Sequence, residues 1–256
     1  MALSIAVFSL LQISAASFLV FSRFSRIEEA DLRERAGQVE VLLERELASL
    51  ENLVQSYAEW IDTYEYIDHR QPGYVESNYS TYWLEAQRLD GVFIVGLDGT
   101  MIWSSGIASL TAGPAVHPGK RDPLLYSPDF GEAPLAGVSG FADYGGVLAA
   151  YAAWPVSDDA AALPPRGVLV MVRSLGPELL DTFAPGEGFS FSFLPGEQSL
   201  PIGKALVERQ GDDSSIVRYT PVVAPNGTLL GHWRYAMRRT WLDVASSLIL
   251  WLAVMT

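Results

Sequence analysis

Apolar residues recur every three or four positions along the first part of the chain, which is the spacing of an amphipathic helix. The series keeps a heptad rhythm, with one extra four-residue step that locally unwinds a left-handed supercoil. No proline falls in the run, and Gly37 is its one interior breaker. The pattern predicts a helix over residues 25–67, about 65 Å long, with an apolar seam made of Leu32, Ala36, Val39, Leu43, Leu47, Leu50, Val54, Tyr57, Ile61 and Tyr64.

This predicted stalk helix has two interpretations that the sequence leaves open. Its seam can pack along the chain's own sheet, as an amphipathic helix does in a single domain. The heptad regularity also suits a parallel pair of helices. We expect both, with a homodimer formed through the first half of the N-terminal helix and sheet packing along the second half.

The apolar period changes after residue 90 from helical to strand-like. A second helix is expected over residues 74–90, after the Pro72-Gly73 break, and a short one starts at Pro177 and stops before Pro185. Residues 106–140 are rich in Gly and Pro and predict a loop with one short helix near residues 121–126. Strands are expected at 91–105 (a hairpin around Asp98-Gly99), 145–156, 166–175, 188–194, 215–223 and 227–238.

Hairpins and long helical segments together predict an α+β fold with an antiparallel sheet. No linker clearly divides residues 25–240, so we expect them to form one domain.

Both ends of the chain are apolar. Residues 1–22 carry no charged side chain and would span about 33 Å as a helix, so they predict a transmembrane helix; a cleavable signal peptide is the alternative. Residues 241–256 predict the start of a second transmembrane helix, or a buried terminal helix.

The charge and composition exclude several classes of function. The formal charge of −13 argues against a nucleic-acid partner, and the absence of cysteine removes disulfides and thiolate chemistry. His69, His117 and His232 are isolated in sequence, so a metal site has no support, and no phosphate-binding or nucleophile motif is present. The sequence therefore predicts a non-enzyme with no cofactor and no catalytic residues.

The stretch "SYAEWIDTYEYID", residues 56–68, combines four aromatic side chains with four carboxylates. At helical spacing such rings pack on a core while the acids face water. The alternative is a small-molecule pocket, in which rings supply apolar area and a few polar groups orient the ligand. The residues predicted to line such a ligand-binding site are Trp60, Asp62, Tyr64, Tyr66 and Asn78.

These residues, followed by the Asp98-Gly99 hairpin, resemble the CHASE4 family of bacterial and archaeal receptors. The segment "GVLAAYAAWPVSDDAAALPPRGVLVMVRSL" is similar to the middle of that family. The resemblance implies a PAS-like fold, in which a long helix packs on an antiparallel sheet. It also implies a sensor domain outside the membrane, flanked by two membrane helices and followed by a cytoplasmic output domain.

The function expected from this resemblance is extracytoplasmic sensing in a transmembrane receptor of the bacterial inner membrane, with the sensor domain on the periplasmic side. The ligand is an unknown small molecule or envelope cue, and the output is most simply a diguanylate cyclase or phosphodiesterase that controls cyclic di-GMP. The alternatives are the sensor of a histidine kinase and a constitutive protein-binding scaffold that transmits no signal.

Overall fold

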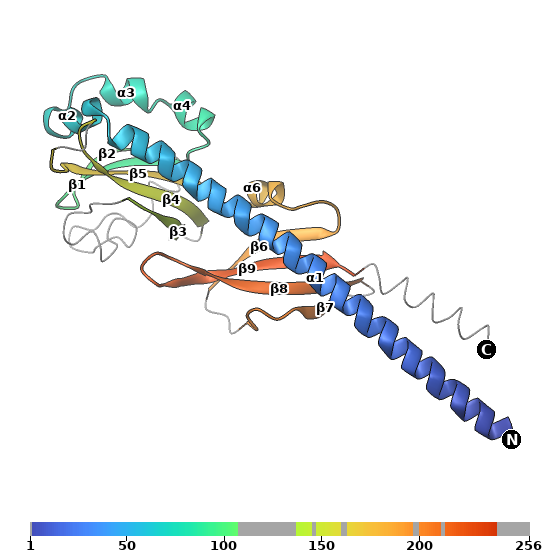
Figure 1. The fold of residues 1–256 in the computed structure, drawn as a ribbon. Helices are drawn as coiled ribbons and strands as arrows, with labels where there is room; N and C mark the ends of the chain where they lie inside the picture. The colour runs from blue at the N-terminus through green and yellow to red at the C-terminus, as the bar shows by residue number, and fades with distance from the viewer. Residues whose placement is uncertain are drawn as a thin grey trace.

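The computed structural model of the chain is organised along one continuous helix, α1 (Ala2–Ala58), with two antiparallel sheets beside it (Figure 1). It describes residues 2–106, 137–144, 147–159, 163–196, 200–210 and 213–239. The predicted short helix at 121–126 and the predicted second membrane span at 241–256 lie outside these residues. The α+β class and the long N-terminal helix are confirmed.

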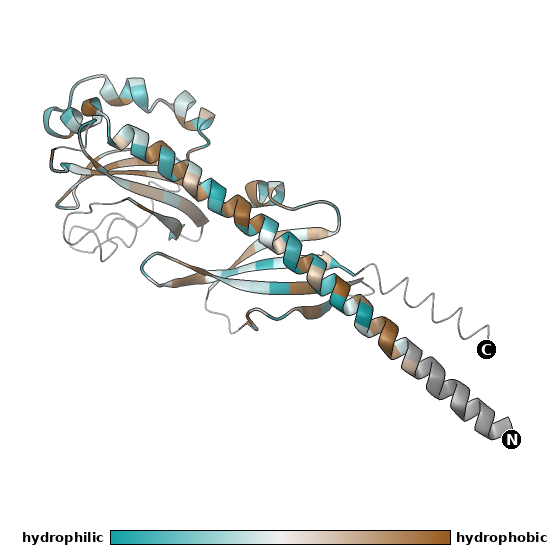
Figure 2. Ribbon diagram, in the orientation of Figure 1, coloured by the Kyte–Doolittle hydropathy of each residue, from teal (hydrophilic) through white to brown (hydrophobic). Residues whose placement is uncertain are grey.

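The first half of the predicted seam packs within the single chain. Leu32, Ala36, Val39 and Leu43 are buried, as are Leu50 and Val54 farther along. Hydrophobic and hydrophilic residues alternate along α1 at helical spacing (Figure 2). The helix contacts β4 and β5 of one sheet and β8 and β9 of the other. The seam positions predicted for a dimer are therefore covered by the chain's own sheets.

The predicted helix breaks near its end. It stops at Ala58, and α2 (Ile61–His69) begins after Trp60, whose backbone is extended. Ala58 O accepts a hydrogen bond from Ser157 N at 3.1 Å. Asp159 Oδ1 accepts one from Ile61 N at 2.8 Å, which caps α2. Both partners lie about a hundred residues away in sequence, so local periodicity cannot predict the break.

The sheet at the far end of α1, called the distal sheet, has the strand order β2-β1-β5-β4-β3. All its neighbours pair antiparallel, and the hairpin around Asp98-Gly99 is confirmed. The strand β3 corrects the sequence analysis, because its start lies in the segment predicted as loop. The bounds are β1 (Gly91–Gly96), β2 (Met101–Gly106), β3 (Val138–Tyr144), β4 (Val147–Val156) and β5 (Gly167–Ser174).

The sheet nearer the N-terminus, called the proximal sheet, has the order β6-β9-β8-β7. Its presence corrects the expectation of one PAS-like sheet, because the late strands pair with each other and not with the distal set. A helix of this length has room for two sheets side by side. The bounds are β6 (Phe189–Pro195), β7 (Leu206–Gln210), β8 (Asp213–Val223) and β9 (Leu229–Arg238).

Three short helices complete the described chain. The single helix predicted over 74–90 is two helices, α3 (Tyr74–Asn78) and α4 (Thr81–Ala86), because Ser80 starts a new one by accepting a hydrogen bond from Trp83 N. The helix α6 (Pro177–Thr182) connects the two sheets and has Pro177 at its first position, as predicted.

The predicted membrane span over residues 1–22 belongs to the first turns of α1. Within the part of the chain that the structure describes, no helix has both the length and the hydropathy to cross a membrane.

The end of the proximal sheet is fastened to α1. Arg239, which follows β9, donates from Nε to Glu28 Oε2 at 2.6 Å and from Nη2 to Ser25 Oγ at 3.1 Å. Glu28 is almost completely buried. A buried ion pair is stabilising only while both partners stay in place. The chain therefore leaves the proximal sheet in contact with the helix at which it began.

The carboxylate of Glu208 in β7 supports a pH-dependent prediction. It accepts hydrogen bonds from the Tyr219 hydroxyl and from Arg234 Nη2, and these two contacts lower the pKa of Glu208 below its usual value of 4.5. A depressed folded-state pKa contributes stability that is present above the unfolded value and is lost as the pH falls through the folded one. Glu208→Gln should therefore lower the free energy of unfolding at about pH 7, by no more than about 1 kcal/mol because the pair is partly exposed.

Urea unfolding at several pH values measures this effect. The difference between Glu208→Gln and the parent should shrink as the pH drops below about 4.5. The matched control is Glu187→Gln, because Glu187 is an exposed glutamate between α6 and β6. A difference that stayed constant from neutral to acidic pH would contradict the assignment.

Candidate functional site

A cluster of aromatic side chains fills the space between the end of α1 and the helices α2, α3 and α4. Tyr79 is at its centre, with ring centroids 5.8 Å from Tyr57, 6.0 Å from Tyr74 and 5.5 Å from Trp83. Trp103 of β2 lies 5.3 Å from the same ring. Such contacts stabilise beyond their buried area. The cluster therefore fixes three short helices that have few hydrogen bonds of their own.

The hydroxyl groups of this cluster bond to each other inside it. Trp83 Nε1 donates to Tyr57 OH at 2.9 Å, and the hydroxyls of Tyr74 and Tyr79 lie 3.4 Å apart. Thr63, which is fully buried, shares a hydrogen bond with Tyr74 OH and donates to Tyr57 O. Burial raises the pKa of both Tyr74 and Tyr79. Both phenols are therefore protonated near neutral pH and act as structural groups.

The five residues predicted to bind a ligand lie around this cluster, but they do not converge on one point. Tyr66 is buried and stacks on Tyr74, with ring centroids 4.9 Å apart. Asn78 Nδ2 donates to Tyr74 O, one turn back on its own helix. Both residues therefore have structural partners.

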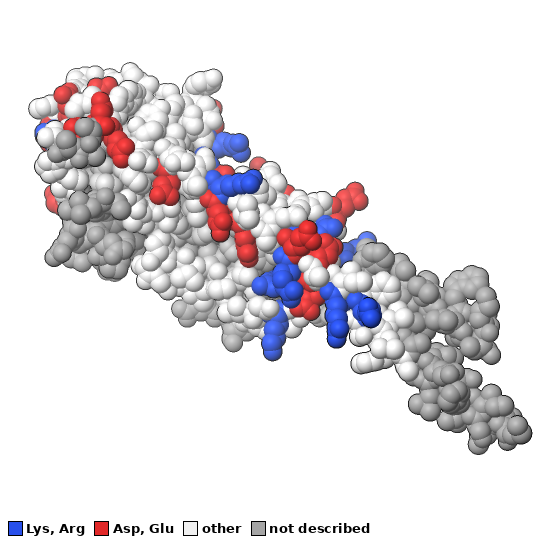
Figure 3. Space-filling view, in the orientation of Figure 1, with Lys and Arg blue, Asp and Glu red and all other residues white. Residues whose placement is uncertain are grey.

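The other three predicted residues lie at the rim. Tyr64 is buried under the Arg166 guanidinium, whose central carbon is 3.8 Å from the ring centroid. Trp60 is 37% exposed, with its ring against Tyr57, and Asp62 is exposed. Acidic side chains gather at this end of the molecule, the end where Figure 1 places α2 (Figure 3). Trp60 and Asp62 are thus the two most exposed of the predicted residues.

A different part of the distal region is hollow. A cavity of about 500 Å³, here called the waist groove, opens between α4, the ends of β1, β2 and β5, and α6. Its volume is within the range of small-molecule sites. Leucines from α4, from the turn after it and from α6 form its apolar wall. The lining residues are Thr81, Leu84, Glu85, Arg88, Leu89, Asp90, Ser105, Gly106, Arg173, Ser174 and Leu179.

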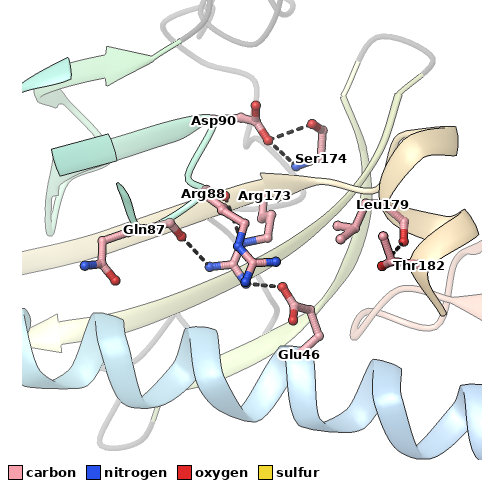
Figure 4. A network of polar contacts seen from close by, with 8 residues as sticks. All are labelled: Glu46, Gln87, Arg88, Asp90, Arg173, Ser174, Leu179 and Thr182. Atoms are coloured by element: carbon pink, nitrogen blue, oxygen red, sulfur yellow. Dashed lines mark hydrogen bonds and ion pairs between the residues drawn. The ribbon is translucent and has the colours of Figure 1, made fainter. Parts of the chain in front are cut away.

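Arg173 joins the waist groove to α1 (Figure 4). It is a buried cation at the end of β5, and its Nε donates to Arg88 O at 2.9 Å while Nη2 donates to Gln87 O at 2.7 Å. Its Nη1 forms an ion pair with Glu46 of α1. Beside it, Asp90 Oδ2 accepts hydrogen bonds from Ser174 N and Oγ, both at 2.6 Å. One side chain thus connects the turn after α4, the distal sheet and the long helix.

The turn after α4 has a Schellman geometry with an arginine at the position that usually holds glycine. Leu89 N donates to Leu84 O at 2.8 Å, and Arg88 N donates to Glu85 O at 3.0 Å. Arg88 has a left-handed backbone with φ of 53°. A side chain there costs about 1 kcal/mol relative to glycine. The hydrophobic pair of this motif, Leu84 and Leu89, lines the waist groove.

Sequence reasoning missed the waist groove, although one signal was available. Arg173 is the one charge in the apolar run "GVLVMVRSL". A buried arginine requires a carboxylate or several carbonyl partners. Its partners come from residues 46, 87 and 88, so the chain does not place them next to it. Among the described residues, no group of three or more metal-ligating side chains gathers.

Solved structures of receptor domains align with this chain over most of their length. The sensor domain of the histidine kinase DctB from V. cholerae aligns with a TM-score of 0.51 and 13% identity, over 82% of this chain and 98% of that one. The extracellular domain of the putative histidine kinase vpHK1S-Z8 aligns with a TM-score of 0.47 and 11% identity, over 88% and 96%. The ligand-binding domain of the Pseudomonas fluorescens chemoreceptor CtaA, in complex with L-isoleucine, gives 0.43 and 13%, over 93% and 98%.

The long helix with two antiparallel sheets is thus a fold that this chain shares with the DctB sensor domain. Residues 42–194 match the CHASE4 domain, and the chain belongs to the CHASE4 family. A comparison with curated proteins finds no match. The family resemblance in the sequence is therefore confirmed, and the matched residues include all of the distal sheet and the waist groove.

The Arg173 network gives a stability prediction. Arg173→Met keeps most of the volume but leaves Glu46 and two backbone carbonyls without their donor. Breaking a buried pair on one side costs about 3–5 kcal/mol. The free energy of unfolding from urea titration should fall by that amount.

The control for this variant is Arg33→Met. Arg33 forms an exposed ion pair with Glu29 on α1, and exposed pairs contribute less than about 1 kcal/mol. Equal losses in the two variants would show that Arg173 is no more than a surface charge.

Proposed function

We propose that this CHASE4 domain is the extracytoplasmic sensor of a membrane receptor. In this proposal the domain has no catalytic role. A small ligand binds in the distal region, and α1 passes the bound state to an output domain. Family membership supports this role, and the expected output is a diguanylate cyclase or phosphodiesterase, with a histidine kinase as the alternative. The location that goes with it is the periplasmic side of the bacterial cell membrane.

The observation that carries the proposal is the pair of ion pairs that connects α1 to the distal sheet and to the end of the proximal sheet. Glu46 meets Arg173 at the waist groove, and Glu28 meets Arg239 after the proximal sheet. Between them, Arg35 Nη1 donates to Pro185 O, just after α6, at 2.9 Å. A helix is stiff, so a shift at Glu46 reaches Glu28, about 27 Å away along the axis.

A ligand can shift this arrangement only if it binds the two states unequally. Arg173 offers a physical means, because it touches both the groove and α1. A ligand group that competes for its donors weakens the contact with Glu46, and one that orders the groove strengthens it. Coupling free energies between two sites typically change a binding affinity by about 5- to 150-fold.

Glu46→Gln tests the relay in the full-length receptor, by measuring basal output in membranes as cyclic di-GMP turnover or autophosphorylation. The neutral amide keeps the size of the side chain and removes its charge, so we expect the basal output to change by about fivefold or more. Glu44→Gln, at an exposed position two residues earlier, is the matched control and should leave the output at the parent level. Identical outputs from parent and Glu46→Gln would favour a constitutive scaffold.

We also propose that the receptor is a homodimer through the N-terminal helix, on a face other than the predicted seam. Ile27 and Val41 are 51% and 45% exposed and lie fourteen residues apart, which is two heptads. Glu34 and Ala48 continue this spacing and are exposed too. Three of these four exposed positions are apolar, and apolar residues at heptad spacing are the pattern of a helix pair.

Single cysteine variants check the dimer, because the chain has no cysteine of its own. Ile27→Cys and Val41→Cys should form disulfide-linked dimers under mild oxidation in membranes. Val39→Cys is the control, since Val39 is fully buried by the chain's own sheets. Crosslinking of Val39→Cys, without crosslinking of Ile27→Cys or Val41→Cys, would contradict a dimer through this face of the helix.

A further inference from the structure

The waist groove is lined by two arginines, Arg88 and Arg173, and by two carboxylates, Glu85 and Asp90. Of its ionisable side chains, Asp90 is bonded twice to Ser174, and Arg173 has committed three of its five N–H donors. Arg173 keeps two donors, and it is a buried residue of the groove lining. The guanidinium of Arg173, held by these contacts at the end of β5, is therefore a cationic hydrogen-bond donor in the groove wall.

Arg88 adds a second cation at the rim. Within the part of the chain that the structure describes, its guanidinium has no hydrogen bond or ion pair, and its side chain is exposed. The left-handed Schellman turn fixes its backbone, although glycine would fit that turn at lower cost. A guanidinium is a planar fork that matches a carboxylate with two hydrogen bonds.

The rest of the groove indicates the body of the ligand. Leu84, Leu89 and Leu179 form an apolar wall, which favours a hydrocarbon group and gives nothing to a strongly hydrated inorganic anion. Ser105 of β2 is also in the lining and offers a hydroxyl. The one acidic side chain in the lining without a partner among the described residues is Glu85, which is exposed on α4. For an amine, the groove offers the exposed Glu85 and Asp90, whose Oδ2 already accepts two hydrogen bonds from Ser174. For a carboxylate, it offers Arg88 and the two remaining donors of Arg173, which also pairs with Glu46.

We propose that the waist groove binds a small organic carboxylate with an apolar body. Its carboxylate lies between Arg88 and the free donors of Arg173, and its hydrocarbon part lies on the three leucines. This inference rests on the proposed sensor function, since it names the ligand class that the sensor would recognise. It also explains why arginine, and not glycine, occupies position 88, where the backbone is left-handed.

Isothermal titration of the full chain with 4-methylpentanoate tests the proposal. The matching amine, 4-methylpentan-1-amine, and inorganic phosphate serve as comparison probes. We expect the carboxylate to bind with a dissociation constant of about 1 mM or tighter, and the two comparison probes to bind at least about tenfold more weakly. Failure of the carboxylate to bind, or stronger binding of the amine, would overturn the proposal.

Three variants locate the site. Arg88→Ala should weaken carboxylate binding by about tenfold or more, and Arg88→Lys by less, because lysine keeps the charge but loses the fork. Arg33→Ala removes an exposed arginine of α1 and should bind as the parent does. Trp60→Ala and Asp62→Ala examine the site predicted from the sequence. Binding lost in these two variants and kept in Arg88→Ala would place the ligand at the aromatic rim and overturn the waist groove.

The experiments distinguish a failure of the ligand assignment from a failure of the proposed sensor function. Binding that depends on Arg88 but leaves the receptor's output unchanged contradicts the sensor function and keeps the ligand assignment. An output response to 4-methylpentanoate that survives in Arg88→Ala contradicts the ligand assignment and keeps the sensor function.

Discussion

The structure depends on the packing of one helix against two sheets. The apolar seam of α1 is buried first by the proximal sheet and then by the distal sheet, and neither sheet contributes a comparable long element. Burying each aliphatic side chain on that seam contributes about 1.5–3 kcal/mol. The two sheets therefore share one stabilising surface, and a change in how either sheet lies on α1 is felt by the other.

Polar contacts decide where the sheets lie along this surface. Apolar packing has no direction, whereas the ion pairs of Arg173 with Glu46 and of Arg239 with Glu28 fix particular residues opposite each other. Both pairs are largely buried, which makes a mismatch costly. The same pairs thus set the register of the fold and provide the proposed connection between the waist groove and the end of the domain.

Residues 56–68 include both structural core residues and exposed residues, and the sequence pattern does not distinguish the two. Tyr57, Tyr64 and Tyr66 are structural, since their rings pack against Tyr79, Arg166 and Tyr74. Trp60 and Asp62 lie at an exposed rim, beside the break between α1 and α2. Helical spacing predicted that most of the rings would be core, but it could not show that Ser157 and Asp159 interrupt the helix within the stretch.

The sequence by itself determined the elements that depend on neighbours along the chain. The presence of a long N-terminal helix, the hairpin around Asp98-Gly99, the start of α6 at Pro177 and the family all follow from local periodicity, turn residues and motif. Tertiary structure alone decided the division into two sheets and the waist groove. Strand pairing and the partners of Arg173 join residues separated by tens to more than a hundred positions. Such contacts are selected by the packing of the whole chain, so no local pattern encodes them.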